Sequence, residues 1–275
     1  MDLRKRPLVV PIEGGLGAQI LGVALYDFLR QRSRKNNTAE PYIDLSYFSA
    51  PPSTSTGISI YGWQLDYYGI ARSEFEDVPP TRKRNGIRRL LSSGPKWLND
   101  GTIERQEVLI TAVSQSRSNL VSRFPISETD LRKSADLLTD LGPDHCVVHL
   151  RRGDYLAVAS HIVVDDDLLP VLRGLIRAGV NSLLFISDSE VNLDFFRVHL
   201  PSSIGLSSIV GGDLYLSHAL MRQARILVTS NSQFSFSAAL LNDQGLRLMP
   251  KVWFSGPHAD LHEQLMRLSN WLIIS

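Results

Sequence analysis

Cysteine is almost absent from this chain, because Cys146 is the only one among its 275 residues. A framework of disulfides within the chain is therefore excluded, and no cluster of cysteine and histidine has the spacing of a zinc site. Cys146 lies within an apolar run, so we expect it to be a small core residue. The sequence predicts no metal ligands.

A surplus of charge is also missing, since 29 basic and 28 acidic residues leave a formal net charge of +1. Proteins that bind nucleic acid depend on a strongly basic surface, so we expect no nucleic-acid partner. The basic segment Arg82–Arg89 is a local exception. It is typical either of a solvated loop or of a peripheral contact with anionic lipid. The sequence does not indicate an oligomeric state.

Long apolar runs are missing as well. The basic N-terminus leads into only a few apolar residues before Pro11 and Glu13, which is too short for a signal-peptide core or a membrane span. Hydrophobic residues make up 43% and charged residues 21% of the chain, the profile of a soluble globular protein. We therefore expect a cytoplasmic protein, either free in solution or peripheral to the inner face of the membrane.

What the chain does contain is an alternation of apolar strand patterns with helical patterns. Strands are predicted at Leu8–Ile12, Tyr42–Phe48, Glu107–Val113, Cys146–Leu150, Ser182–Ile186, Ile204–Val210, Arg225–Thr229 and Leu246–Trp253. Helices are predicted at Ala18–Arg32, Asp130–Leu141, Asp165–Ala178, Glu190–His199, Leu214–Gln223, Gln233–Leu241 and His258–Leu272. This alternation favours parallel, doubly wound sheets.

The break Gly142–Asp144 divides the pattern and predicts a domain boundary there. We expect an α/β protein of two Rossmann-like domains, residues 1–143 and 144–275, with a cleft between them. The acidic run Asp165–Asp167 stands at the start of a predicted helix, where it favours the helix dipole. That position indicates a structural role for the run.

The segment Cys146–Tyr155, CVVHLRRGDY, places two adjacent arginines just after an apolar strand. Guanidinium groups bind phosphate oxygens bidentately, and ligands of open α/β sheets sit at the carboxyl ends of the strands. Arg151 and Arg152 therefore indicate an anion site. The alternative is a surface loop with solvated arginines.

A second candidate anion site follows the strand that ends at Thr229. Hydroxyls and amides gather here before a helix of small residues, in Ser230, Asn231, Ser232, Gln233 and Ser235. A helix N-terminus offers free backbone amides to an anion, although ordinary N-capping explains the same residues. Together with the arginine pair, the two features converge on one sheet edge, which favours a diphosphate.

The glycine-rich turn that follows the first strand begins like a dinucleotide motif but does not complete it. Gly15 and Gly17 supply the first two glycines, whereas Ile20 occupies the position of the third. This argues against an NAD-dependent oxidoreductase. Glycines let the backbone approach another molecule or the opposite domain closely, and the alternative is a tight turn from strand to helix.

Three further polar residues have two interpretations each. His149 can hydrogen-bond a base or sugar, or it can be a satisfied core histidine. Asp188, which ends a predicted strand, can cap the next helix or bind a ribose or base. His218 lies on a helix face with Met221, where packing is the more frequent role.

With these residues in place, the pattern resembles glycosyltransferase family 11, the α-1,2-fucosyltransferases, and the wider group with α-1,6 and protein O-fucosyltransferases. The similar segments occur in the family's order: GGLGAQ (Gly14–Gln19), YGWQLDYYGI (Tyr61–Ile70), HLRRGDY (His149–Tyr155), SDS (Ser187–Ser189) and SNSQFSFSA (Ser230–Ala238). The chain departs from the family pattern at Ala18, at Ser189 and at Phe236–Ser237, where the family has asparagine, a second aspartate and paired tryptophans.

The resemblance implies a GT-B-like arrangement, with an acceptor-side domain at 1–143 and a nucleotide-sugar-binding domain at 144–275. It implies inverting transfer of fucose from GDP-fucose, without a metal or other cofactor, to a hydroxyl of a glycan acceptor, the 2-hydroxyl of a galactoside. Arg151 and Arg152 would hold the diphosphate, and His149 would contact the guanosine side. Ser232, Gln233 and Phe234 would bind phosphate, and Asp188 would contact the nucleoside.

The acceptor hydroxyl must lose a proton, and Asp154 and Glu13 are the carboxylates nearest the two expected cleft walls. The choice between them stays open, since Asp154 can instead anchor the arginine loop by a salt bridge. Two other functions stay open as well: transfer of another sugar from a GDP-type donor, and binding of a nucleotide or carbohydrate without turnover.

Overall fold

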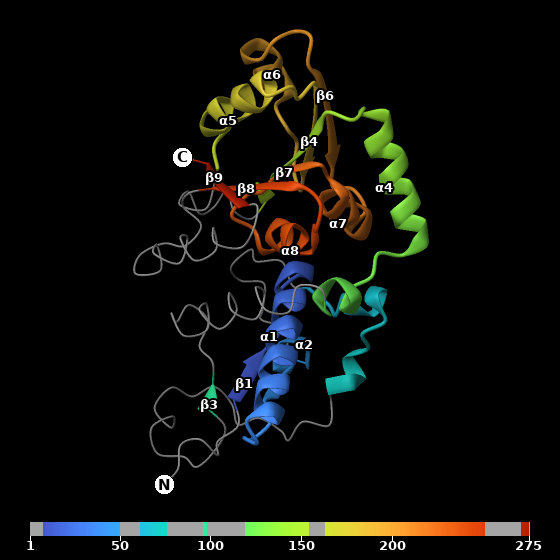
Figure 1. Ribbon diagram of the computed structural model, residues 1–275, viewed down its shortest axis with the longest axis vertical. Coiled ribbons are helices and arrows are strands. Elements are labelled where there is room, and N and C mark those ends of the chain that lie inside the picture. Colours follow the sequence, from blue (N-terminus) through green and yellow to red (C-terminus); the bar gives the residue numbers. More distant parts are fainter. Residues whose placement is uncertain are drawn as a thin grey trace. The chain divides into compact units, whose positions relative to one another are not determined.

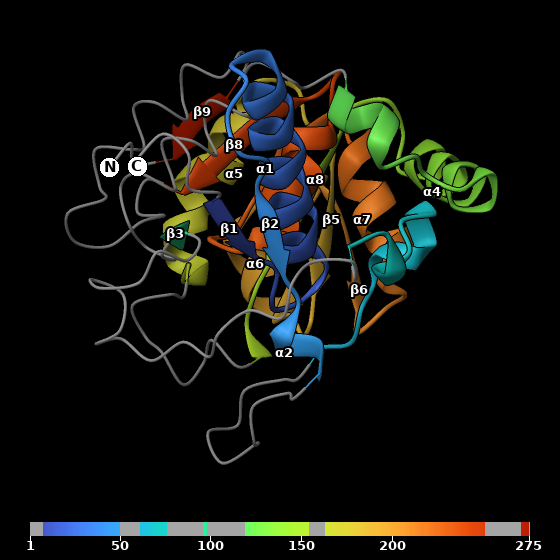
Figure 2. The same cartoon turned by 90° about the horizontal axis from the view of Figure 1, so that it is seen from below.

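The computed structural model describes residues 8–49, 61–75, 96–97, 119–153, 163–250 and 271–274, which are coloured in Figure 1. The chain forms two compact units, Met1–Phe124 and Pro125–Ser275. The predicted boundary at residue 143 lies further along the chain, after helix α4 (Glu128–Asp140). Because α4 packs against helix α7 (Leu214–Gln223), as Figures 1 and 2 show, it belongs to the second unit.

The first unit is built on a parallel sheet in the order β2-β1-β3. Within the described residues its strands are β1 (Leu8–Pro11), β2 (Tyr42–Asp44) and β3 (Lys96–Trp97), and its helices include α1 (Leu16–Lys35), α2 (Ser46–Ser49) and the 3-10 helices η2 (Leu65–Tyr68) and η3 (Arg72–Phe75). Helix α1 packs Leu25, Phe28 and Leu29 against Val10 of β1. The predicted strand and helix on either side of the glycine turn are thereby confirmed.

The predicted strand Tyr42–Phe48 is wrong beyond Asp44. The carboxylate of Asp44 accepts a hydrogen bond from the backbone N–H of Ser46 at 2.9 Å, and the chain turns there into α2. A short aspartate side chain that bonds the backbone two residues on is a turn former. The predicted strand Glu107–Val113 lies outside the described residues.

The second unit contains a parallel sheet in the order β6-β5-β4-β7-β8-β9. Its strands are β4 (His145–Leu150), β5 (Ser182–Ser187), β6 (Gly205–Val210), β7 (Ile226–Val228), β8 (Leu246–Pro250) and β9 (Trp271–Ile274), and the helices between them are α5 (Asp165–Arg177), α6 (Leu193–His199), α7 and α8 (Gln233–Leu241). This is the strand order of a Rossmann fold, which reverses its winding between β4 and β7. The predicted doubly wound sheet is confirmed.

The predicted helix His258–Leu272 is wrong at its end, because Trp271 and Leu272 belong to β9, which pairs with β8. The β-branched residues Ile273 and Ile274 favour the strand. The edge of β8 that faces away from β7 supplies the hydrogen bonds of β9. The rest of the predicted helix lies outside the described residues.

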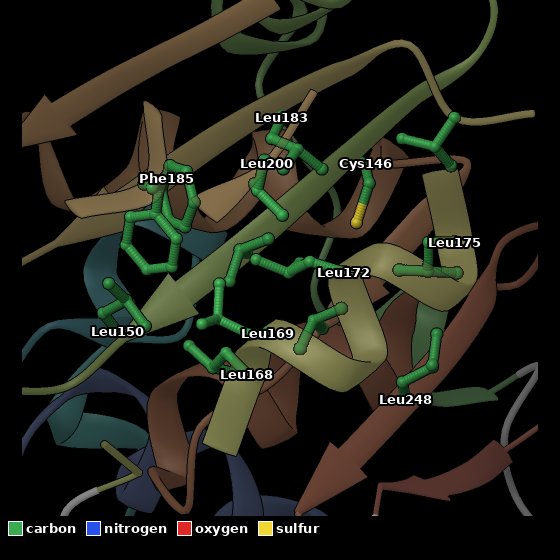
Figure 3. Packing of buried hydrophobic residues seen from close by; sticks show 14 of the residues in the cluster. Cys146, Leu150, Leu168, Leu169, Leu172, Leu175, Leu183, Phe185, Leu200 and Leu248 are labelled. Carbon is green, nitrogen blue, oxygen red and sulfur yellow. The ribbon is translucent and has the colours of Figure 1, made fainter. Parts of the chain in front are cut away.

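The two faces of the β4 strand have different neighbours. Cys146, Val148 and Leu150 face α5 and α6 in a core that also contains Leu172 and Phe185, as Figure 3 shows for most of these side chains. Cys146 is fully buried, as expected. Because side chains alternate along a strand, Val147 and His149 point to the opposite face, which α7 and α8 cover. Helix packing therefore sets the surroundings of His149.

Candidate functional site

The arginine motif and the serine-rich turn meet where the sheet of the second unit reverses its winding. β4 ends at Leu150 and β7 ends at Val228, and the two strands are direct neighbours that pair Val148 with Val228. In open α/β sheets the ligand binds outside the carboxyl ends of the strands at this reversal. The fold thus brings both predicted anion-binding features to the expected position for a ligand.

Arg151 is held by the carboxylate of Asp188, which follows β5. Its Nη1 atom lies 2.8 Å from Asp188 Oδ2. The other oxygen, Oδ1, accepts hydrogen bonds from the backbone N–H groups of Arg152, at 2.8 Å, and Gly153, at 3.2 Å. A Cβ atom on Gly153 would lie 2.5 Å from Asp188 Oδ2. Asp188 therefore fixes the turn that carries both arginines, a role that the sequence also offered to Asp154.

Arg152 is tied to the start of α5. Its guanidinium donates to the carbonyl oxygen of Val163 and to Oδ1 of Asp165. The side chain of Arg152 is only 12% exposed, whereas that of Arg151 is 21% exposed. Neither arginine is a freely solvated surface residue, so the solvated-loop interpretation is wrong for this pair.

The serine-rich turn is the N-terminus of α8. Ser232 caps the helix by accepting the backbone N–H of Phe234 at 3.3 Å. The hydroxyl of Ser235 donates to the carbonyl oxygens of Ser230 and Ser232, both at 3.3 Å. The Oδ1 atom of Asn231 is buried and has no partner within the described part of the chain. Ordinary N-capping is therefore present, and one cap leaves other backbone amides of the first turn available to an anion.

Two buried histidines flank Phe234 at the start of α8. The ring centroid of Phe234 lies 5.6 Å from that of His149 and 5.4 Å from that of His218. His149 Nδ1 shares a hydrogen bond of 2.7 Å with Ser230 Oγ, and His218 Nε2 shares one of 3.1 Å with Ser237 Oγ. The predicted packing role of His218 agrees with its complete burial.

Both histidines are neutral at physiological pH. Burial, together with the charge of Arg151, lowers the pKa of His149 to about 3. Burial, and then the charge of Arg222, lowers the pKa of His218 well below its ordinary value. A neutral imidazole has one donor and one acceptor nitrogen, so each ring holds its serine partner without adding charge to the site.

The glycine turn lies in the first unit, between β1 and α1. Gly14 has a φ of +80°, and a Cβ atom on Gly15 would lie 3.3 to 3.5 Å from three ring atoms of Tyr61. Gly17 is buried in the first turn of α1. The turn thus joins strand to helix, and its glycines also allow the close approach of an aromatic residue that belongs to a segment far along the chain.

Gln19 is a structural residue that sequence reasoning missed. It is fully buried, and its Nε2 donates to the carbonyl oxygens of Gly14, at 2.8 Å, and Gly62, at 2.9 Å. Its Oε1 accepts the backbone N–H of Gln64 at 2.9 Å. Gln19 therefore connects the glycine turn to the Tyr61–Ile70 segment. Gln19 lies opposite the apolar face of the predicted helix, so the helical pattern gave no signal of its burial.

Most of the predicted site residues of the second unit gather around the ends of β4, β5 and β7: His149, Arg151, Arg152, Asp188, Ser230, Asn231, Ser232, Gln233 and Phe234. Gly15 and Gly17 belong to the first unit. Asp154 and the basic segment Arg82–Arg89 lie outside the described residues. From the sequence, Asp165 was expected only to interact with the helix dipole. Its contact with Arg152 places it in the site as well.

Within the described ranges, no group of three or more histidine, cysteine, aspartate or glutamate side chains could hold a metal ion. The helices described there include none with the length and apolar character that crossing a membrane requires.

Comparison with known proteins supports the sequence resemblance. The profile of the family described as Glycosyl transferase family 11 matches residues 129–275, which covers more than half of the chain and nearly all of the second unit. None of the curated proteins compared is significantly similar in sequence.

Solved structures with a similar fold include two of POFUT1. The complex of POFUT1 with GDP-fucose has a TM-score of 0.51 and 14% identity, over 89% of this chain and 95% of that one. The complex with GDP has a TM-score of 0.52 and 14% identity, over 88% and 96%. This likeness extends over both units and shows a shared α/β fold of the GT-B-like class. The predicted cleft stays a prediction.

Proposed function

Because the chain belongs to glycosyltransferase family 11, we propose that it transfers fucose from GDP-fucose, with inversion, to a hydroxyl group of a glycan acceptor. The finer proposal is the 2-hydroxyl of a galactoside. One observation carries the donor assignment: two fixed arginines and the start of α8 converge where the sheet reverses its winding. That arrangement suits a nucleoside diphosphate.

In the proposed donor complex, Arg151, Arg152 and the first turn of α8 bind the diphosphate. Fold neighbours of this chain were crystallised with GDP and GDP-fucose, which supports a guanine nucleotide. His149 would lie on the guanosine side, next to Ser230. Asp188 stays a predicted nucleoside contact, and its ion pair with Arg151 gives it a second role in the free protein.

The chemistry requires stabilisation of a leaving group. The acceptor oxygen forms a bond to the anomeric carbon of fucose while the bond from that carbon to the β-phosphate oxygen breaks, and GDP leaves with that electron pair. Guanidinium groups and helix amides already aimed at the diphosphate can stabilise the negative charge that develops there. We propose that Arg151 and Arg152 supply the charge that a divalent metal supplies in other transferases.

The acceptor hydroxyl gives its proton to a base. Asp154 and Glu13 are both candidates, one from each unit. Asp154 is close in sequence to the arginine pair, and Glu13 directly precedes the glycine turn. Replacing each with its amide separates them. The base variant should lose turnover and keep GDP binding, because removing the base leaves the donor contacts intact.

A thermal-shift panel of nucleotides tests the donor. GDP and GDP-fucose should raise the melting temperature, and EDTA should leave that shift unchanged. A ligand at a hundred times its dissociation constant adds about 2.7 kcal/mol of apparent stability. Stabilisation by UDP- or CMP-sugars, with none from GDP compounds, would refute the donor assignment.

Transfer of another sugar from a GDP-type donor is a second candidate. The chain departs from the family pattern at Ala18, Ser189 and Phe236–Ser237, and these departures are the reason to test other GDP-sugars. Ser189 contacts the arginine turn by accepting the N–H of Gly153 at 3.2 Å. Release of GDP from a panel of GDP-sugars, with and without β-galactosides, separates fucose transfer from this alternative. GDP binding without turnover of any sugar would indicate a binding protein.

A further inference from the structure

We propose that Asp165 is a positioning residue that holds the guanidinium of Arg152 ready for the diphosphate of the donor. This proposal rests on the proposed function, because it gives the ligand of Arg152 as a diphosphate. Asp165 is 13 residues further along the chain than Arg152, and folding brings the two side chains into contact.

Arg152 is fixed at three points. Its backbone N–H donates to Asp188 Oδ1 at 2.8 Å, and its guanidinium donates to the Val163 carbonyl oxygen and to Asp165 Oδ1. A guanidinium carries five N–H donors, so the two side-chain bonds leave three for phosphate oxygens. Because the side chain is only 12% exposed, the ion pair is screened less by water and salt than a surface pair. Arg152 is thus oriented before any ligand arrives.

The neighbouring aspartates distinguish this role from a helix-dipole role. Asp165, Asp166 and Asp167 all lie in the first turn of α5, where each carboxylate interacts favourably with the helix dipole. Asp166 and Asp167 are exposed, whereas Asp165 is half-buried and contacts Arg152. If the role were confined to the helix dipole, replacing any of the three aspartates should have the same effect on the site. The contact with Arg152 predicts that replacing Asp165 has a larger effect.

The sign of the effect on binding is also informative. Removal of a negative charge beside an anion site should strengthen anion binding if simple Coulomb repulsion dominates. If Asp165 positions Arg152, its removal should weaken binding instead, because the freed arginine must be ordered again in each binding event. The two explanations therefore predict opposite changes in the dissociation constant for GDP.

The test compares Asp165→Asn with Asp166→Asn, which removes the same charge one residue further on. We expect Asp165→Asn to lower kcat/KM for GDP-fucose by about ten- to a hundredfold and to weaken GDP binding, while Asp166→Asn leaves both unchanged. In an Arg152→Ala background, Asp165→Asn should have no further effect, since it acts through that arginine. Equal behaviour of the two variants, tighter GDP binding by Asp165→Asn, or full additivity with Arg152→Ala would overturn the proposal.

A second measurement does not depend on the ligand. The side-chain NMR signal of Arg152, assigned by its loss in Arg152→Lys, should show hindered rotation of the guanidinium in the free wild-type protein. Free rotation would overturn the positioning role. If the wild-type protein neither binds GDP nor releases it from GDP-fucose, the proposed function fails. The rotation measurement, repeated in Asp165→Asn, still decides whether Asp165 holds Arg152: rotation should be faster in the variant, and equally hindered rotation in both proteins would overturn the positioning role.

Discussion

The Nδ1 atom of His149 and the hydroxyl oxygen of Ser230 lie 2.7 Å apart and share a buried hydrogen bond. This contact joins the end of β4 to the chain that follows β7. It lies between the arginine turn on one side and the start of α8 on the other. The two anion-binding features of the site are therefore connected by a direct side-chain bond as well as by neighbouring strands.

Ser230→Ala should destabilise the protein by about 1–3 kcal/mol, because it leaves a buried imidazole nitrogen without its partner. The double variant His149→Phe/Ser230→Ala should cost less than the sum of the two single variants, since it removes both polar partners. Urea unfolding of the four proteins measures both quantities. Strict additivity of the two single effects would show that the bond contributes nothing to stability.

Stability should fall with acid below pH 6.5 because of the buried histidines. Burial lowers the pKa of His149 from 6.5 to about 3, so the folded protein keeps this ring neutral where the unfolded chain binds a proton. His218 is shifted in the same direction. Well below pH 6.5, His149 alone should cost about 1.4 kcal/mol of stability per pH unit, and His218 adds to the loss in the same direction. About one pH unit above 6.5, both the folded and the unfolded chain keep these rings almost entirely neutral, and this contribution no longer changes with pH.

Urea unfolding at pH 7.5, 6 and 5 measures this slope. The His218→Leu variant should lose stability less steeply between pH 6 and pH 5 than the wild type does, because it removes one of the two rings. A wild-type stability that stays constant from pH 7.5 to pH 5 would contradict the burial of neutral histidines.

The glycine turn should matter for transfer and leave donor binding intact. A Cβ atom on Gly15 would already lie 3.3 Å from Tyr61 Cε1, so the branched side chain of Gly15→Val must displace the tyrosine. We expect this variant to lose transfer activity and to keep GDP binding, because the arginines belong to the other unit. Gly62→Val is the matched control, since a Cβ atom on Gly62 would meet nothing within 4 Å. Loss of GDP binding by a folded Gly15→Val protein would place this turn at the donor instead.

Gln19→Leu should destabilise the first unit strongly. The substitution keeps the size of the side chain but leaves the carbonyl groups of Gly14 and Gly62 and the N–H of Gln64 without their partner. Buried polar groups that lose a partner cost about 1–3 kcal/mol each. Thermal unfolding should show a lowered transition for this variant. An unchanged transition would mean that water replaces all three bonds.

The strand-end position of the site could be predicted from sequence because parallel strands bring their carboxyl ends to one edge. Apolar runs located β4 and β7, and the polar residues that follow them had to meet near the reversal of the sheet. The contacts among those residues could not be predicted in the same way. Asp188 binds Arg151 across two strands, and Asp165 reaches Arg152 from a helix that begins further along the chain.

Local pattern reasoning failed where one short segment suits two structures. The apolar residues Trp271 and Leu272 fit the face of a helix as well as a buried strand, and pairing with β8 decides for the strand. Asp44 ends β2 early because its carboxylate bonds the backbone of Ser46. Gln19 was predicted to lie in a helix, but two of its three partners, Gly62 and Gln64, belong to a segment more than forty residues away.

The arginine pair provides the most direct test of the active site. If Arg151 and Arg152 bind the diphosphate, their contribution should be larger in the transition state than in the ground state, because charge on the leaving group grows as the bond to fucose breaks. Changing either arginine to alanine should therefore lower kcat as well as weaken GDP-fucose binding. Loss of a donor from a preorganised site of this kind costs about 10²–10³ in kcat, and we expect a loss of that order for at least one of the two.

Lysine should not replace either arginine fully, because an ammonium group lacks the bidentate fork. Steady-state kinetics with GDP-fucose, together with GDP titration, separates the effect on kcat from the effect on binding. Asp154→Asn is the companion variant: a collapse of kcat with GDP binding intact would identify the base, whereas partial activity with weaker binding would indicate an anchor for the arginine turn. Two folded Arg→Ala variants that turn over at the wild-type rate would show that the site at the ends of β4 and β7 is not where transfer occurs.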